Sequence, residues 1–309
     1  MSFLKQKFDL CVFELPEGFH LTEGEAFQKL KSNKFTELSP SHEFGHGWAN
    51  ILNMFSDFGM EDTVASNALV GGYRYDRKKI PSALLNKLFK EKLKEFCKER
   101  DIKRANKDDK KIIKQECKDQ LLIQTLATPK LASWFIDTEN NRVYLSSKIK
   151  SVVDSFASLF NQTFEIPLKV KDFNMESEEI RDFLDFLWSN LRDFDPELEE
   201  QKDGLWMNQE VTLDYDKNTF KFNGPTIEEY KKDIQSFKKS KKIKSMNVGF
   251  KKGNLEYAVT LNNKNMFFAV EILDKIDHES IETAVLDNLD NINQVINQIE
   301  NLVDTFQDS

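Results

Sequence analysis

The sequence is poor in cysteine, and its three cysteines are far apart. Cys11, Cys97 and Cys117 form no C-x-x-C pair, so the pattern predicts neither a disulfide framework nor a cysteine zinc site. We expect reduced thiols in a reducing compartment, with no metal and no other cofactor.

Long apolar runs are also missing. Charged residues interrupt the apolar residues of the first fifteen positions, so no signal peptide is predicted. No run approaches the roughly 18 apolar residues that a membrane span needs. We therefore expect a cytoplasmic protein that makes no use of a membrane.

Signatures of catalysis are few. The chain has no P-loop, no dinucleotide-binding fingerprint and no G-x-S-x-G motif. It does contain H-E-x-x-H from His42 to His46, the spacing that places two zinc-binding imidazoles on one face of a helix in metalloproteases. Pro40 and Gly47 flank the motif, so we expect a loop over residues 39–50, and no catalytic or metal-binding residues. Zinc metalloprotease remains an alternative function.

Charge is unevenly distributed along the chain. The formal net charge is −8, but the segment 74–118 carries 17 basic and 8 acidic residues, and the segment 231–252 carries nine lysines and one acidic residue. These segments hold +9 and +8, which leaves −25 on the remainder. Such a mosaic suits an acidic protein with a local, positive binding surface for nucleic acid. The alternative interpretation is that these are solvated helix faces and loops.

The candidate DNA contacts come from these two segments and from Lys130. Clustered lysines beside rigid structure make phosphate contacts, which read charge rather than base sequence. We expect the cations near residue 78 to face the same space as those near residue 241, and the cations at 103 and 107 to lie apart from both. The candidates are Arg74, Arg77, Lys78, Lys79, Lys111, Lys114, Lys118, Lys130, Lys238, Lys239, Lys241, Lys242 and Lys244.

Two basic helices are the clearest structural prediction. Pro81 is suited to begin a helix, and apolar residues then recur at helical spacing up to Phe96. A polar stretch over 98–109 follows, and Ile113, Cys117 and Leu121 resume the spacing. Each helix has a narrow apolar stripe and a broad charged face, which is typical of a projecting αα-hairpin arm.

The remaining pattern mixes strands and helices without strict alternation. We therefore predict an α+β protein, with mixed sheets, packed helices and the projecting arm. The expected units are a central domain of 1–75 plus 130–170, the arm of 76–129, and a C-terminal α+β domain of 171–309. The expected strands are 8–13, 63–75, 134–137, 143–145, 211–215, 246–250, 255–261 and 266–272, and the expected helices are 22–31, 149–160, 176–191, 226–237 and 279–306.

Several short motifs resemble the bacterial recombination-associated family RdgC. Lys78-Lys79-Ile80-Pro81-Ser82 resembles the K-I-L-P-S opening of that family's arm, and the segment 118–122 resembles the end of its second arm helix. The segment 134–138, W-F-I-D-T, resembles the family's W-I-D-T strand, and Gly47-Trp48 resembles its G-W loop. The strand-rich part from 242 to 272 and the closing helix also follow the family's order.

The resemblance implies a protein that binds double-stranded DNA without marked sequence preference. It further implies a ring-forming homodimer, associated with the nucleoid, that limits access of the recombinase RecA to DNA, with the arm and the opposite base as dimer contacts. The family's P-R-A-F-S-R segment is shortened here to residues 126–130, which lack its Phe. A further alternative is a protein-interaction module that has lost DNA binding, because an acidic surface can mimic DNA.

Overall fold

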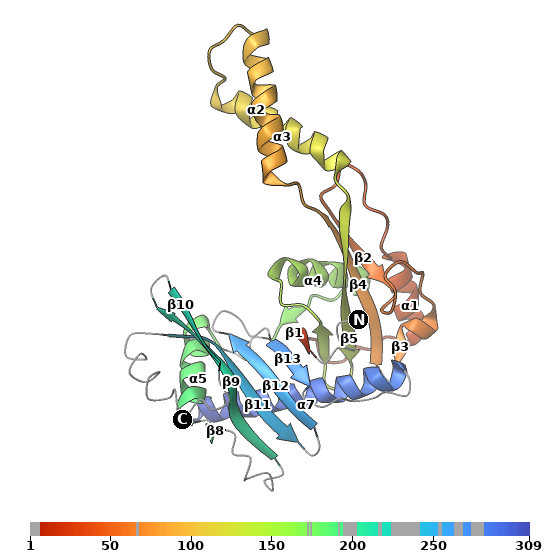
Figure 1. The fold of residues 1–309 in the computed structure, drawn as a ribbon. Helices are drawn as coiled ribbons and strands as arrows, with labels where there is room; N and C mark the ends of the chain where they lie inside the picture. Colours follow the sequence, from red (N-terminus) through yellow and green to blue (C-terminus); the bar gives the residue numbers. More distant parts are fainter. Residues whose placement is uncertain are drawn as a thin grey trace.

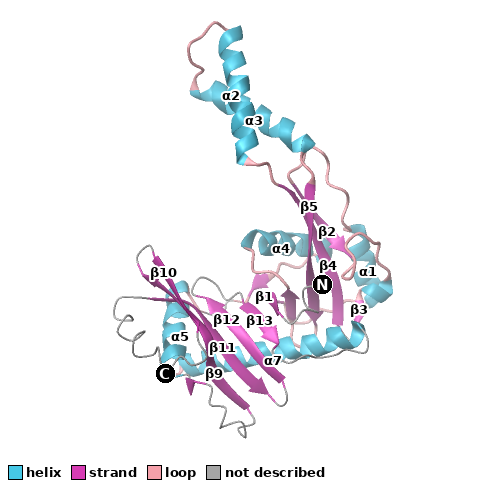
Figure 2. Ribbon diagram, in the orientation of Figure 1, coloured by secondary structure: helices cyan, strands magenta, loops and turns pink. Residues whose placement is uncertain are grey.

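The structure is a computed structural model of the chain. It describes residues 7–65, 68–171, 173, 175–190, 192–193, 203–215, 218–223, 242–252, 255–262, 268–272 and 281–309. Figures 1 and 2 show a mixed α+β body from which a helical arm projects. The predicted fold class is therefore confirmed.

The strands follow one another along a single, mainly antiparallel sheet path. In spatial order this path is β10-β9-β11-β12-β13-β1-β6-β5-β4-β2, with β3 beside β4, β7 beside β1 and β8 beside β9. The strands are β1 (Lys7–Glu14), β2 (Phe44–Ala49), β3 (Val64–Ala65), β4 (Ala68–Lys78), β5 (Ala127–Asp137), β6 (Arg142–Leu145), β7 (Lys169–Val170), β8 (Arg192–Asp193), β9 (Asp203–Tyr215), β10 (Asn218–Asn223), β11 (Lys242–Lys252), β12 (Leu255–Asn262) and β13 (Phe268–Ile272).

Strand β1 joins the two halves of this path. Its first half, from Lys7 to Leu10, pairs with β13, and its second half, from Cys11 to Glu14, pairs with β6. Successive side chains of a strand point to opposite faces, so β1 contributes to two cores. Its apolar run is buried on both sides as a result, with Leu10 in one core and Phe13 in the other.

Helices cover both faces of the sheet. α1 (Glu23–Ser32) and α4 (Lys150–Phe164) pack on one face of the central strands, in a core that contains Trp48 and Trp134. α5 (Ser177–Asn190) and α7 (Ile281–Gln307) pack on the other face. α7 runs beneath both halves of the sheet (Figure 1), and it is fixed there by Arg142, which contacts Glu300 at 2.8 Å.

The arm consists of α2 (Ser82–Glu99) and α3 (Lys107–Gln124). It grows out of the paired strands β4 and β5, well away from the other helices (Figure 1). α3 buries Ile113, Cys117 and Leu122, whereas α2 has no buried residue. This shallow burial is expected of a hairpin that projects from the body, so the predicted arm is confirmed.

One local prediction is wrong, and another lies outside the described residues. The predicted loop over 39–50 contains strand β2, because Gly47 allows a close approach that the local sequence does not reveal: a Cβ there would lie 2.4 Å from the Cα of Phe35. The predicted helix over 226–237 lies outside the part of the chain that the structure describes.

Candidate nucleic-acid interface

The foot of the arm, where β4 and β5 pass into its two helices, exposes basic side chains on one face of the sheet. Directly paired residues of neighbouring strands share a face. Arg77 and Lys130 are exposed there, on adjacent strands. From the arm downward, the rows across β2, β4 and β5 are Phe44-Arg77-Thr128, His46-Tyr75-Lys130 and Trp48-Tyr73-Ala132.

α4 covers the lower part of the same face. The indole nitrogen of Trp48 donates to Thr163 Oγ1 at 2.8 Å, and the hydroxyl of Tyr73 donates to Ser155 Oγ at 2.7 Å. The row of Trp48 and Tyr73 is therefore buried beneath α4, while the row of Arg77 is open. The exposed basic face thus begins where the cover of α4 ends.

The arm continues the positive charge from this foot. Lys111, Lys114 and Lys118 are spaced by three and four residues on α3, so they lie on one side of that helix. Lys111 and Lys114 are exposed. Lys118 reaches Glu43 with a 2.6 Å ion pair. That hydrogen bond lowers the pKa of Glu43, and the charges of Lys118 and Arg77 lower it further.

Arg74 does not join this face. Along β4 it alternates with Arg77, so its side chain points to the opposite side. Only 7% of the side chain is exposed, and Nε and one terminal nitrogen donate to the two oxygens of Asp76 at 2.9 and 2.8 Å. Its predicted contact with phosphate therefore disagrees with the structure, where Arg74 is a buried, paired cation.

Lys78 is also buried, again on the face opposite Arg77. Its Nζ donates to the carbonyl of Pro40 at 2.6 Å and to that of Leu122 at 3.1 Å. The second carbonyl lies in the last turn of α3, so Lys78 ties the arm to the segment before β2. The predicted phosphate contact is replaced by this structural role, whereas the next residue, Lys79, is exposed.

The second basic segment is only partly described. Lys238, Lys239 and Lys241 lie outside the described residues, and the side chain of Lys242, at the start of β11, is also outside them. Lys244 is half-buried on β11, and its Nζ donates to Thr219 Oγ1 of β10 at 3.4 Å. Whether the two basic segments face the same space stays a prediction.

The H-E-x-x-H motif does not form the helix that a zinc site requires, because its second half lies on strand β2. His46 lies on strand β2, and its Nδ1 is 2.9 Å from the hydroxyl of Tyr73. The helical spacing that would bring His42 and His46 to one metal is therefore absent, which overturns the premise of the metalloprotease alternative. Among the described residues, no three His, Cys, Asp or Glu side chains are grouped to hold a metal ion.

Two aromatic residues at this face were not among the predicted contacts. Phe44 is paired with Arg77 and is 38% exposed, and half-buried Tyr75 is paired with Lys130. Aromatic rings beside cations are typical of nucleic-acid-binding surfaces. The signal that joins them is the strand register, which the sequence alone does not supply.

Comparison with known protein families gives a match over more than half of the chain. Residues 7–194 match the family model described as "RdgC: Putative exonuclease, RdgC". The chain belongs to the RdgC family. The match covers the central strands, the arm and α5, so the whole foot of the arm lies within the RdgC region. No curated protein matches the chain.

In the described residues, no helix is both long and apolar enough to cross a membrane.

Proposed function

We propose that this RdgC-family protein binds double-stranded DNA without marked sequence preference, through the basic face at the foot of the arm. The observation that carries the proposal is the placement of Arg77 and Lys130 on adjacent strands of one open face, which α3 extends with Lys111 and Lys114. Such cations neutralise phosphates, and phosphate contacts carry no base information. The family membership and its link to recombination support the same function.

The protein acts in this proposal as a homodimer that occupies DNA and so limits access of the recombinase RecA. Such a role places it in the cytoplasm, associated with the nucleoid. The exposed apolar residues on the arm support self-association, because burying them in a second copy would remove them from water.

The test compares two sets of lysines and arginines on the same chain. Replacing Arg77, Lys79 and Lys130 together with Ala should weaken binding to unrelated duplexes equally, and should lower the slope of log affinity against log salt by about 0.9 for each phosphate that these cations neutralise in the parent. Lys103→Ala, Arg104→Ala and Lys107→Ala together are the matched control, because they also remove three exposed cations. These residues are exposed at the arm tip, about 27 Å from its foot along an 18-residue helix.

Two results of that titration would overturn the proposal. One is a parent protein that does not bind duplex DNA at low salt. The other is a tip variant with reduced affinity beside a foot variant that binds like the parent, because the DNA surface would then lie along the arm instead.

We further propose that the protein binds DNA without cleaving it, although the family description names an exonuclease. The proposal rests on a site built mainly from cations and aromatic rings, which bind phosphate and bases. End-labelled duplex incubated with the protein and Mg²⁺ or Mn²⁺ should stay intact. If the parent releases labelled mononucleotides and the variant with Ala at Arg77, Lys79 and Lys130 does not, the protein is a nuclease instead.

A further inference from the structure

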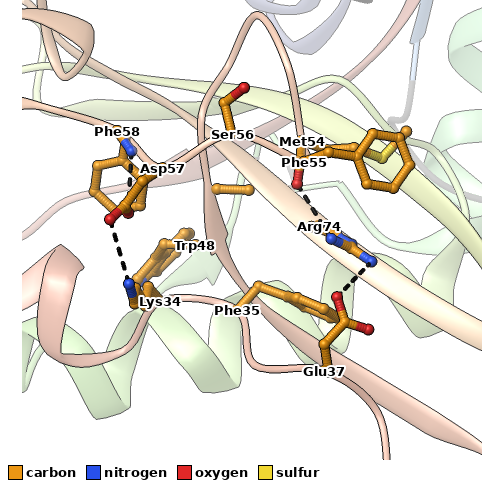
Figure 3. A pocket seen from close by; sticks show the side chains of 11 residues that line it. Lys34, Phe35, Glu37, Trp48, Met54, Phe55, Ser56, Asp57, Phe58 and Arg74 are labelled. Atoms are coloured by element: carbon orange, nitrogen blue, oxygen red, sulfur yellow. Dashed lines mark hydrogen bonds and ion pairs between the residues drawn. The ribbon is translucent and has the colours of Figure 1, made fainter.

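A cavity of about 230 Å³ opens beside β2 and β4. Figure 3 shows its walls, with Arg74 at one end, Lys34 and Asp57 at the other, and Trp48 and Phe35 between them. Along β4 the side chains of Arg74 and Arg77 point to opposite faces of the sheet. The guanidinium of Arg74, which lines the cavity, therefore lies on the face opposite the basic face. The lining residues are Lys34, Phe35, Glu37, Trp48, Ala49, Met54, Phe55, Ser56, Asp57, Phe58 and Arg74.

Arg74 is held in place as one wall of this cavity. Asp76 binds it through two nitrogens, and a third donates to the carbonyl of Met54 at 3.2 Å. Its guanidinium carbon lies 3.9 Å from the ring centre of Phe35 and 5.0 Å from that of Phe55. The cavity wall is therefore a fixed, planar cation between two aromatic rings.

Phe55 is 68% exposed at the mouth of the cavity, yet its loop is well fixed. Asn50 Oδ1 accepts from the backbone N–H groups of Leu52 and Asn53, at 2.7 and 3.1 Å. Asn53 Oδ1 accepts from the N–H of Phe55 itself, and its Nδ2 donates to Ser56 Oγ at 2.7 Å. A large apolar ring held in water on an ordered loop is typical of a binding platform.

The rim of the cavity carries charges of both signs. Lys34 pairs with Asp57 at 3.4 Å, and Lys31 is exposed nearby in the last turn of α1. The cavity is smaller than the roughly 300–1,000 Å³ of a usual small-molecule site, so it suits a single planar group. Arg74 and Lys34 already pair with Asp76 and Asp57, so the planar guanidinium and the aromatic rings decide what the cavity accepts. A heteroaromatic ring with its own donors and acceptors would meet both the rings and the polar groups.

We propose that this cavity, the Arg74 pocket, accepts one unpaired nucleobase of single-stranded DNA at its mouth, stacked on the exposed part of the Phe55 ring that Arg74 does not cover, while Lys31 and Lys34 contact the adjoining phosphates. Stacking on a ring is available to every base, so this contact adds no sequence preference. The proposal rests on the proposed DNA binding and deepens it, because it adds a second site that recognises unpaired strands.

The test measures binding of the full chain to a 12-mer of thymidine and to a blunt duplex. Phe55→Ala should weaken binding of the single strand about tenfold, which lies within the roughly 1–3 kcal/mol that a stacked base contributes, and should leave duplex binding unchanged. Leu52→Ala is the matched control: Leu52 is 41% exposed on the same loop but does not line the pocket. Phe55→Trp should restore single-strand binding.

Each other outcome overturns the proposal in a recognisable way. If Phe55→Ala weakens duplex and single strand equally, Phe55 belongs to the general DNA surface. If it changes neither, the pocket takes no base, and a protein side chain becomes its candidate occupant. Failure of the proposed function gives a different result, because the parent would then not bind the duplex at all. In that case, single-strand binding that depends on Phe55 would still support the pocket.

Discussion

At the scale of single residues, His46 shows how the fold changes the chemistry of a side chain that the sequence presents as a metal ligand. It is half-buried between Phe44 and Tyr73, with ring centres 5.3 and 5.7 Å away. Burial lowers the pKa of His46 below its ordinary value. The unfolded chain therefore binds a proton more readily than the folded one, and stability should fall as the pH drops below about 6.5.

The free energy of unfolding, measured in urea at pH 7.5 and pH 5.5, checks this expectation. The parent should lose stability at the lower pH, and His46→Gln should lose less because it removes the titrating group. His20→Gln is the control, since His20 is exposed and its replacement should leave the acid sensitivity of the parent intact. An equal decrease in stability in the parent and in His46→Gln would contradict the prediction.

At the scale of elements, Gly47 decides whether strand β2 can form. A Cβ on this residue would lie 2.4 Å from the Cα and 2.5 Å from the backbone nitrogen of Phe35. Backbone atoms cannot move aside as a side chain does, so Gly47→Ala should destabilise the fold by about 1–3 kcal/mol. Gly24→Ala makes the same chemical change in α1, where nothing lies within 4 Å, and should stabilise by about 0.5–1 kcal/mol. Thermal unfolding should show a lower midpoint for Gly47→Ala and a higher midpoint for Gly24→Ala than for the parent. If Gly47→Ala is as stable as the parent, strand β2 does not depend on the absence of a side chain at residue 47.

The sequence predicted those elements whose signals are local. Thr22 and Glu25 form the predicted capping box at the start of α1, and the apolar spacing gave both helices of the arm. β2 was not predicted because glycines usually indicate a turn. Here Gly47 instead allows the backbone of β2 to lie against the backbone of Phe35. Arg74 and Lys78 were predicted to contact DNA but are buried, because composition shows charge while the orientation of strand β4 decides which side chains are exposed.

At the scale of the whole molecule, the arm carries more exposed apolar surface than a solvated hairpin needs. Ile112 and Ile123 are 58% and 60% exposed, and they lie eleven residues apart, three turns along one side of α3. Leu126 is 88% exposed in the shortened segment that lacks the family's Phe. These residues face away from the packing of α3 on α2, which uses Ile113 and Cys117, so a second copy could cover them.

We expect the parent to sediment as a dimer at micromolar concentration, and Ile123→Lys with Leu126→Lys to sediment as a monomer. Lysines on both copies would repel each other, and a buried unpaired charge is costly. Both positions are exposed in one copy, so each monomer should keep the parent's far-UV circular dichroism. Leu52→Lys with Met60→Lys, at two positions outside the arm that are 41% and 40% exposed, is the matched control for two added charges. A monomeric parent would contradict the proposed dimer, and a double variant that stays dimeric would place the interface elsewhere on the molecule.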